Sequence, residues 1–397
     1  MIIIEEMKKI LSWKRLLLLL GFAVMYFMIF LKPFVQMNPG SYHQFADKTK
    51  EMIQEYGSRM TPEVFSQFKA EVQDMKAHPG GDLEKVDDYI RKNELCASYD
   101  IFDLDSFFGS GMEDLTREQQ MLLWDELYKG LTDVEIYQAQ DQNIDISAWV
   151  GAVELYEQEV LFASRSENGT QFYDNLSEAQ RLRVSQRNKD ELYGILPPTI
   201  LDSHLEVLQF AGAFMLLSVI FLIVPYVVGD NRSRLVDFQY TSVKGRRFYL
   251  YKLLAAICSA VLIMAVQVGA LAGIFKINAV TDFWNSPVSS FQTGFISWFS
   301  LTLGQLTLLA VGLCVVLGVG MVLVVFAVTR YCVNYITAIA WQLPLVVLAG
   351  LFGGILMKSF TEITSLKYMP MAVGIGGFAV GAAAVAVQYV VERKKNM

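Results

Sequence analysis

The sequence has little of the chemistry that most enzymes and metal sites use. Its 397 residues include only 3 His and 4 Cys. His43, His78 and His204 are far apart and lack Cys or acidic partners at ligand spacing, so we expect no zinc site. No G-x-x-x-x-G-K-[ST] phosphate loop and no H-E-x-x-H motif is present. A membrane enzyme would need such a motif, a pair of in-membrane Asp residues or a Ser/Lys pair. We therefore predict a non-enzymatic chain with no cofactor of its own.

Cysteine usage also argues against a disulfide-stabilised domain. Cys258, Cys314 and Cys332 lie in or at the end of apolar runs, where a free Cys behaves as a small hydrophobic residue. Cys96 stands alone in an acidic region, so that region has no internal disulfide.

Long apolar runs are what the sequence does contain. Hydrophobic residues make up 53% of the chain, and the mean hydropathy is +0.35. Crossing a bilayer takes about 20 apolar residues, and backbone polar groups in lipid must be satisfied within the segment, so we expect helices. Six runs qualify: 12–31, 206–228, 249–275, 295–329, 331–357 and 369–391.

The first run has the basic start and apolar core of either a transmembrane helix or a signal peptide. Its core is long for a signal peptide, and the following residues 32–37 contain no small-x-small cleavage site. These features favour an uncleaved helix, with a cleaved signal peptide as the alternative.

Charge divides the chain into two regions. Residues 33–204 contain 32 of the 40 acidic side chains but only 15 of the 33 basic ones, a net charge of −17. The other residues carry a net charge of +10. We predict an all-α membrane protein with three parts: an N-terminal elbow and first helix (1–32), an acidic, mainly helical extracytoplasmic domain (33–204), and a five-helix bundle (205–397).

Basic residues beside the apolar runs predict the orientation, because Lys and Arg concentrate in cytoplasmic connections. Fourteen of them lie before or at the start of the first run, between the second run and the start of the third, between the fourth and fifth, and after the sixth. The opposite connections, apart from 33–204, contain Lys32, Lys276, Lys358 and Lys367. We therefore place the chain in the plasma membrane, with both termini in the cytoplasm and residues 33–204 outside.

Apolar positions at helical spacing in residues 33–204 predict helices within 42–76, 83–96, 116–130, 147–164 and 177–193. Thr116 and Ser177 are start signals. Trp124, Tyr128, Trp149 and Tyr156 recur at helical intervals, and we interpret them as the small core of this domain. Its paired carboxylates lack the spacing of a calcium loop and are interpreted as a solvated acidic surface.

No ionisable residue falls near the middle of an apolar run, unlike transporters that couple to protons or sodium. The polar residues there are neutral, and we expect hydrogen bonds between helices rather than substrate contacts. They are Gln209, Gln267, Thr302, Gln305, Gln342 and Gln388. Glycines in the fourth and sixth runs predict close helix contacts there. If this bundle moves a substrate uphill, the energy must come from a partner.

The most specific pattern is the basic segment 229–247 between the second and third runs. Leu235 and Phe238 share a helical face with charged residues around them, which predicts a short amphipathic helix at the membrane surface. The alternative is an ordinary basic loop held by anionic lipid. We predict that partner coupling uses Asp230, Arg232, Arg234, Leu235, Phe238, Thr241, Ser242, Lys244, Arg246 and Lys252.

This segment resembles the permease subunits of type-2 ABC transporters. In that family the second helix ends with an acidic residue, an interfacial coupling helix follows, and the chain re-enters the membrane with a Lys. Asp230, residues 233–240, the turn 241–246 and Lys252 match that order. Here Asp replaces the usual Glu, and Arg232-Ser233 replaces a Gly often found a few residues after the acid. The basic N-terminal elbow and the long insertion after the first helix also resemble the family.

The resemblance implies a membrane permease of an ATP-driven exporter, with a peptide as the expected substrate. Two copies, or this chain and a related one, would form the pathway. Cytoplasmic ABC ATPase subunits holding ATP and Mg would dock on the coupling helices, and no nucleic acid would be involved. The alternative is a sensor or scaffold whose acidic outer domain binds a cationic peptide without transport. Substrate accumulation in vesicles separates the two hypotheses.

Overall fold

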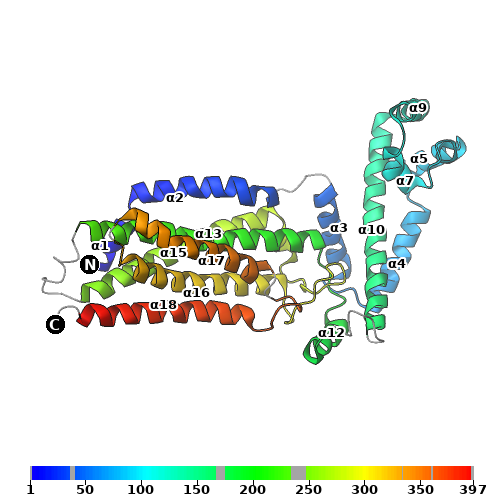
Figure 1. The fold of residues 1–397 in the computed structure, drawn as a ribbon. Helices are drawn as coiled ribbons and strands as arrows, with labels where there is room; N and C mark the ends of the chain where they lie inside the picture. Colours follow the sequence, from blue (N-terminus) through cyan, green and yellow to red (C-terminus); the bar gives the residue numbers. More distant parts are fainter. Residues whose placement is uncertain are drawn as a thin grey trace. The chain divides into compact units, whose positions relative to one another are not determined.

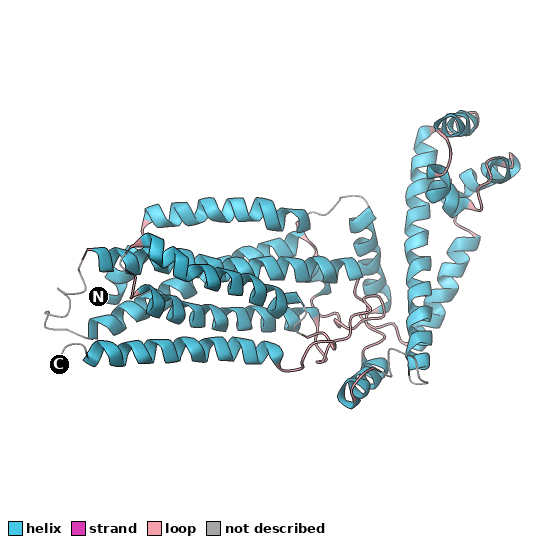
Figure 2. Cartoon of the chain, in the orientation of Figure 1, coloured by secondary structure: helices cyan, strands magenta, loops and turns pink. Residues whose placement is uncertain are grey.

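The structure is a computed structural model, and it describes residues 2–35, 41–166, 175–233, 247–332, 334–358 and 361–394. It is 79% helical, and its described residues contain isolated β-bridges but no strands (Figure 2). The chain forms two compact units, which are described separately. Unit 1 comprises Met1–Pro39, Pro198–Ser289 and Phe295–Met397, and unit 2 comprises Gly40–Pro197 and Ser290–Gly294.

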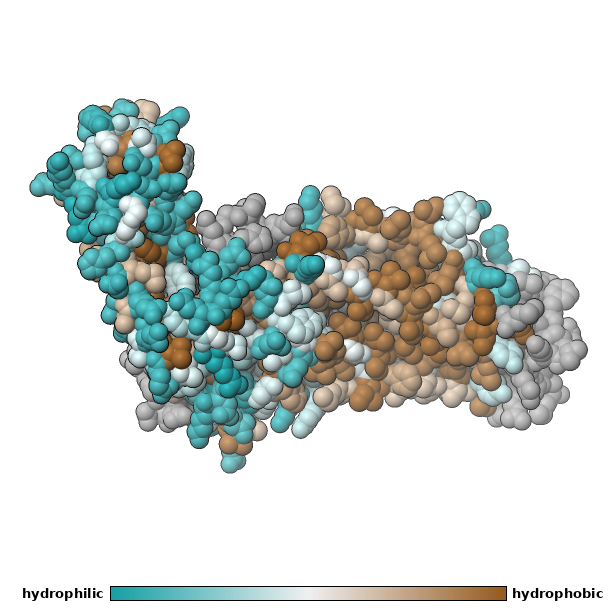
Figure 3. Space-filling model, turned by 180° about the vertical axis from the view of Figure 1, so that it is seen from behind, coloured by the Kyte–Doolittle hydropathy of each residue, from teal (hydrophilic) through white to brown (hydrophobic). Residues whose placement is uncertain are grey.

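Unit 1 is a set of long apolar helices that run alongside one another (Figure 1). The space-filling view shows mostly hydrophobic residues along these helices (Figure 3). Their bounds, with the short helical segments between them, are α1 (Ile2–Ile10), α2 (Trp13–Tyr26), η1 (Phe27–Leu31), η2 (Lys32–Phe34), α13 (Pro198–Arg232), α15 (Arg247–Ile277), η3 (Val280–Phe283), α16 (Leu303–Thr329), α17 (Tyr335–Lys358) and α18 (Met369–Lys394).

Five helices of unit 1 are long and apolar enough to cross a membrane: Trp13–Phe34, Pro198–Arg232, Phe248–Ile277, Leu303–Thr329 and Met369–Val391. Each corresponds to one of the predicted runs. The remaining run, the fifth (331–357), coincides with α17, whose apolar part within the described residues, Tyr335–Leu351, is shorter. A protein with several membrane-spanning helices is therefore supported, and the sixth span stays a prediction.

The fourth predicted run began too early, at residue 295. The helix α16 begins at Leu303, because Thr302 is its N-cap. The Thr302 side chain accepts from the Gln305 backbone N–H, and the Gln305 side chain accepts from the Thr302 N–H, which forms a capping box. In residues 295–302, which precede α16, the backbone N–H of Trp298 donates to the Thr361 carbonyl at 2.7 Å. These residues therefore pair with another loop and do not form part of a helix.

Glycines bring α16 and α18 into backbone contact. A Cβ atom on Gly320 would lie 2.8 Å from the Phe378 backbone, and one on Gly381 would lie 2.5 Å from the Gly320 carbonyl oxygen. A Cβ atom on Gly377 would lie 2.5 Å from the Leu317 side chain. The close helix contacts predicted at these glycines are therefore confirmed, and the structure shows that α16 and α18 are each other's partners.

This contact gives a stability prediction. Gly320→Ala forces α16 and α18 apart, because the new methyl group meets backbone rather than a movable side chain. We expect a loss of about 1–3 kcal/mol, the usual cost of overpacking, measured as a lower thermal midpoint of the purified protein. Gly376→Ala on α18 is the matched control, since a Cβ there meets nothing within 4 Å. Equal midpoints for the two variants would contradict the prediction.

Neutral polar side chains link the helices of unit 1, as expected. The Gln342 amide donates to the Thr329 hydroxyl at 2.9 Å, and the Tyr249 hydroxyl donates to Gln388 at 2.9 Å. Gln267 accepts a longer bond of 3.4 Å from Ser218. Thr302 and Gln305 instead cap the start of α16, and the expected bond of Gln209 stays a prediction.

Unit 2 is built from one long helix, α10, and several shorter ones, and it has a hydrophilic surface (Figure 3). The capping boxes at Thr116 and Ser177 confirm both predicted helix starts. The bounds are α3 (Ser41–Tyr56), α4 (Pro62–Ala77), α5 (Gly81–Lys92), α6 (Leu95–Ser98), α7 (Leu104–Phe108), α8 (Ser110–Glu113), α9 (Arg117–Leu127), α10 (Asp133–Ser166) and α12 (Glu178–Asp190).

Unit 2 has two apolar cores rather than the single small one predicted. Trp149 and Tyr156 lie in the first core, with residues of α3 and α4. Trp124 packs against the second core, which α5, α7 and α9 share with the N-terminal half of α10. Tyr128 is 46% exposed and belongs to neither. The 34-residue helix α10 is long enough to contribute to both cores, which helical spacing alone did not reveal.

Candidate functional site

The candidate site is centred on a buried ion pair between α13 and α15. Lys252 Nζ donates to Asp230 Oδ2, and the two residues are only 3% and 8% exposed. The Lys252 ammonium also lies 5.8 Å from the Tyr226 ring centroid and 5.5 Å from that of Phe248. A charge can be buried at this depth when an opposite charge and aromatic faces compensate for lost water.

Helical spacing positions these side chains. Tyr226 and Asp230 are four residues apart in α13, so they share one face, and Phe248 and Lys252 do the same in α15. Because α13 stays helical to Arg232 and α15 starts at Arg247, both charges belong to rigid helix ends. The segment that connects them is the basic loop that the sequence singled out.

The N-terminal helix α1 joins the same cluster. The Tyr226 hydroxyl donates a hydrogen bond of 2.6 Å to Glu6 Oε2, and the Lys9 ammonium forms an ion pair of 2.6 Å with Glu6 Oε1. Glu6 is 2% exposed, and Ile10 one turn later is fully buried. This acid was missed in the sequence analysis. Glu6 could have been recognised because it lies four residues before Ile10, on the otherwise apolar face of α1.

The end of α16 is tied to α13 by Asn231. Its amide nitrogen lies within hydrogen-bond distance of the carbonyl oxygens of Thr329, Arg330 and Cys332, at 3.3, 3.0 and 3.0 Å. A helix leaves its last carbonyls without helical partners, and the two N–H groups of this amide can donate to the carbonyls at the end of α16. The cluster thus connects α1, α13, α15 and α16 beside the basic loop.

Of the predicted coupling residues, three fall in the described part of the chain. Asp230 and Lys252 are brought together, while Arg232 is exposed in the last turn of α13. The others lie outside the described residues: Arg234, Leu235, Phe238, Thr241, Ser242, Lys244 and Arg246. The predicted amphipathic helix at 233–240 falls almost wholly there too, so it stays a prediction.

This arrangement holds the ends of α13 and α15 and the helix α1 in a fixed geometry. Its polar atoms are engaged in two ion pairs, in aromatic contacts and in the hydrogen bond between Tyr226 and Glu6 of the N-terminal helix α1. No three His, Cys, Asp or Glu side chains gather as metal ligands within the ranges that the structure describes. A force applied to the basic loop would reach α13 and α15 together, and α1 through Tyr226.

The fold and this cluster define an all-helical protein with several helices able to cross a membrane. Comparison with protein-family models, with curated protein sequences and with solved structures finds no match. The function must therefore be argued from the residues.

Proposed function

We propose that this chain is the membrane permease subunit of a type-2 ABC exporter, working as a dimer and driven by separate cytoplasmic ATPase subunits. In this proposal the termini and the basic loop 229–247 face the cytoplasm, and residues 33–204 lie outside. ATP and Mg are held by the partner, and this chain transmits the motion that ATP binding produces. Its substrate is a peptide.

The observation that carries the proposal is the buried Asp230–Lys252 pair. It joins the two helices that flank the basic loop, at the positions where the family resemblance puts an acid and a lysine. A docking loop transmits motion only if both its ends are fixed to the bundle. The ion pair, with Tyr226 and Glu6 behind it, supplies that fixed junction.

Charge reversal in the loop tests the docking. The chain is co-expressed with the ABC ATPases of its source organism, and any complex that forms is purified and reconstituted in nanodiscs. We expect Lys244→Glu to reduce the permease-dependent ATPase rate about tenfold, because like charges at an interface weaken it. Lys276→Glu makes the same charge change at the far end of α15, where Lys276 is exposed, and we expect it to have no effect.

Two results would overturn the proposal. One is the absence of any complex between the chain and those ATPases. The other is an ATPase rate that responds equally to Lys244→Glu and to Lys276→Glu.

A second candidate function is a sensor or scaffold that binds a peptide without moving it. The observation in its favour is a cavity in unit 2, formed by that unit alone. Vesicles containing the permease and its ATPase decide between the two. ATP-dependent accumulation of peptide inside inverted vesicles supports transport, and binding without accumulation supports the sensor.

A further inference from the structure

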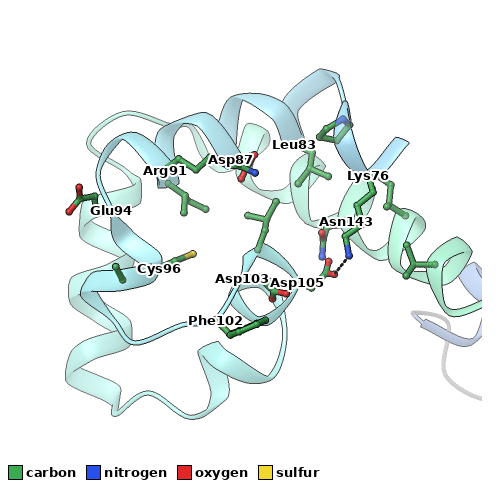
Figure 4. Close-up of a pocket in the computed structure, with 16 residues that line it drawn as sticks. Lys76, Leu83, Asp87, Arg91, Glu94, Cys96, Phe102, Asp103, Asp105 and Asn143 are labelled. Carbon is green, nitrogen blue, oxygen red and sulfur yellow. Dashed lines mark ion pairs between the residues drawn. The ribbon is translucent and has the colours of Figure 1, made fainter. Parts of the chain in front are cut away.

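Unit 2 contains a cavity of about 450 Å³, surrounded by residues of α4, α5, α6, α7 and α10 (Figure 4). Its size falls in the range of about 300–1,000 Å³ that is usual for ligand pockets. Part of its lining is apolar: Leu83, Ile90, Leu104, Ile146 and Val150. Such a lining favours an apolar side chain over water.

Asn143 gives the cavity a polar side chain. This residue of α10 is only 7% exposed and lines the cavity beside Lys76 and Asp105 (Figure 4). Its side-chain amide offers both a donor and an acceptor. These two groups match the C=O and N–H of a peptide bond.

The charged side chains around the cavity are mostly acidic. Asp87, Glu94, Asp103 and Asp105 line it, against Lys76 and Arg91. Arg91 is paired with Asp87 at 2.8 Å, and Lys76 is paired with Asp105 at 3.9 Å, so the lining has two more acidic than basic side chains.

Asp103 contributes a fixed negative charge. Its carboxylate accepts a hydrogen bond of 2.8 Å from the Ser106 backbone N–H at the start of α7. That bond lowers the pKa of the Asp103 carboxyl group, so the group stays ionised at neutral pH. The rim therefore attracts a cation, in agreement with the −17 net charge of residues 33–204.

An exposed aromatic ring and a thiol complete the lining. Phe102 is 92% exposed although it lies beside apolar residues. A ring in this position can pack against a ligand or contact a cation through its face. The thiol of Cys96 also lines the cavity, and burial together with nearby carboxylates raises its pKa.

We infer that this cavity binds a cationic peptide through an apolar anchor residue flanked by Lys or Arg. The anchor side chain fills the apolar lining, and the adjacent peptide bond pairs with Asn143. The flanking cations face Asp103 and Asp105, and Phe102 covers the bound segment. Binding itself is independent of the proposed transport. The identification of this peptide with the transported substrate rests on the proposed function.

The test uses the full-length chain in nanodiscs of zwitterionic lipid, which do not attract cationic peptides. The probe is a fluorescent 12-residue peptide of Lys and Leu, and binding is measured by anisotropy. Two control peptides replace Lys with Glu, or Leu with Ser. We expect each control to bind at least about tenfold more weakly, because one lacks the charge and the other lacks the anchor. Added salt should weaken the Lys/Leu peptide's binding.

Two pairs of variants locate the site. Ala97 is exposed and lines the cavity, so the Trp side chain of Ala97→Trp should fill the cavity and weaken peptide binding about tenfold. Ser98 lies on the same helix but does not line the cavity, so Ser98→Trp should leave peptide binding unchanged. Asp105→Asn should weaken binding about two- to fivefold, and the exposed Asp88→Asn should not.

The rate of Cys96 alkylation at alkaline pH, measured by mass spectrometry, gives an independent readout of peptide binding. Bound Lys/Leu peptide should lower this rate severalfold, and the Glu/Leu peptide should not. The inference is overturned if Ala97→Trp binds as well as Ser98→Trp, or if Cys96 stays unprotected by saturating peptide. Peptide binding with no effect of peptide on the ATPase rate would instead count against the transport proposal alone.

Discussion

Replacing Lys252 with methionine is expected to destabilise unit 1 by about 3–5 kcal/mol, the usual cost of breaking a buried ion pair from one side. The variant leaves the Asp230 carboxylate, on a residue only 8% exposed, without its ammonium partner. Methionine keeps the length of the side chain, so packing between Tyr226 and Phe248 changes little. The measurement is unfolding of the purified protein in a denaturing detergent titration.

The double variant Asp230→Leu/Lys252→Met separates a missing charge from a missing contact. Replacing both members of a buried pair by apolar residues is often neutral or stabilising, so most of the lost stability should return. The exposed Lys276→Met is the control for loss of a lysine. If Lys252→Met were no less stable than Lys276→Met, Asp230 and Lys252 would not form a buried pair in the folded protein.

Part of this site could be predicted from the sequence because the pattern was local. Asp230 and Lys252 stand at either end of one basic segment, and an acid and a base at the ends of two adjacent helices can meet. Glu6 is far away in the sequence, more than two hundred residues from its partner Tyr226. Nothing in the local pattern of either residue indicates which distant side chain it will contact.

The fold shows the same limit. Apolar run length predicted the long helices of unit 1, because crossing a bilayer requires a minimum length whatever the neighbours are. It did not reveal that residues 295–302 pair with another loop, since Phe295, Ile296 and Trp298 are as apolar as a helix interior. In unit 2, helical spacing identified core positions, but it could not divide them between two cores.

Replacing Phe291 with alanine should destabilise unit 2, although this residue comes from the connection between α15 and α16. The segment Ser290–Gly294 belongs to unit 2 and contributes to its first core. Phe291 is 1% exposed, and its ring meets that of Tyr156 edge-on at 5.3 Å. Truncation of a fully buried Phe typically costs about 3–5 kcal/mol.

Two hydrogen bonds hold this segment in place, so the loss should spread into unit 2 rather than stay local. Arg187 donates to the Ser290 carbonyl at 3.2 Å, and the Ser290 hydroxyl donates to the Leu196 carbonyl at 3.2 Å. We expect faster hydrogen exchange in α4 and α10 of the Phe291→Ala variant. The half-buried Phe299→Ala in the same connection, but in unit 1, should leave those helices protected. Unchanged exchange in Phe291→Ala would mean that unit 2 folds without this segment. Increased exchange would mean that the connection between α15 and α16 cannot move without disturbing the core of unit 2.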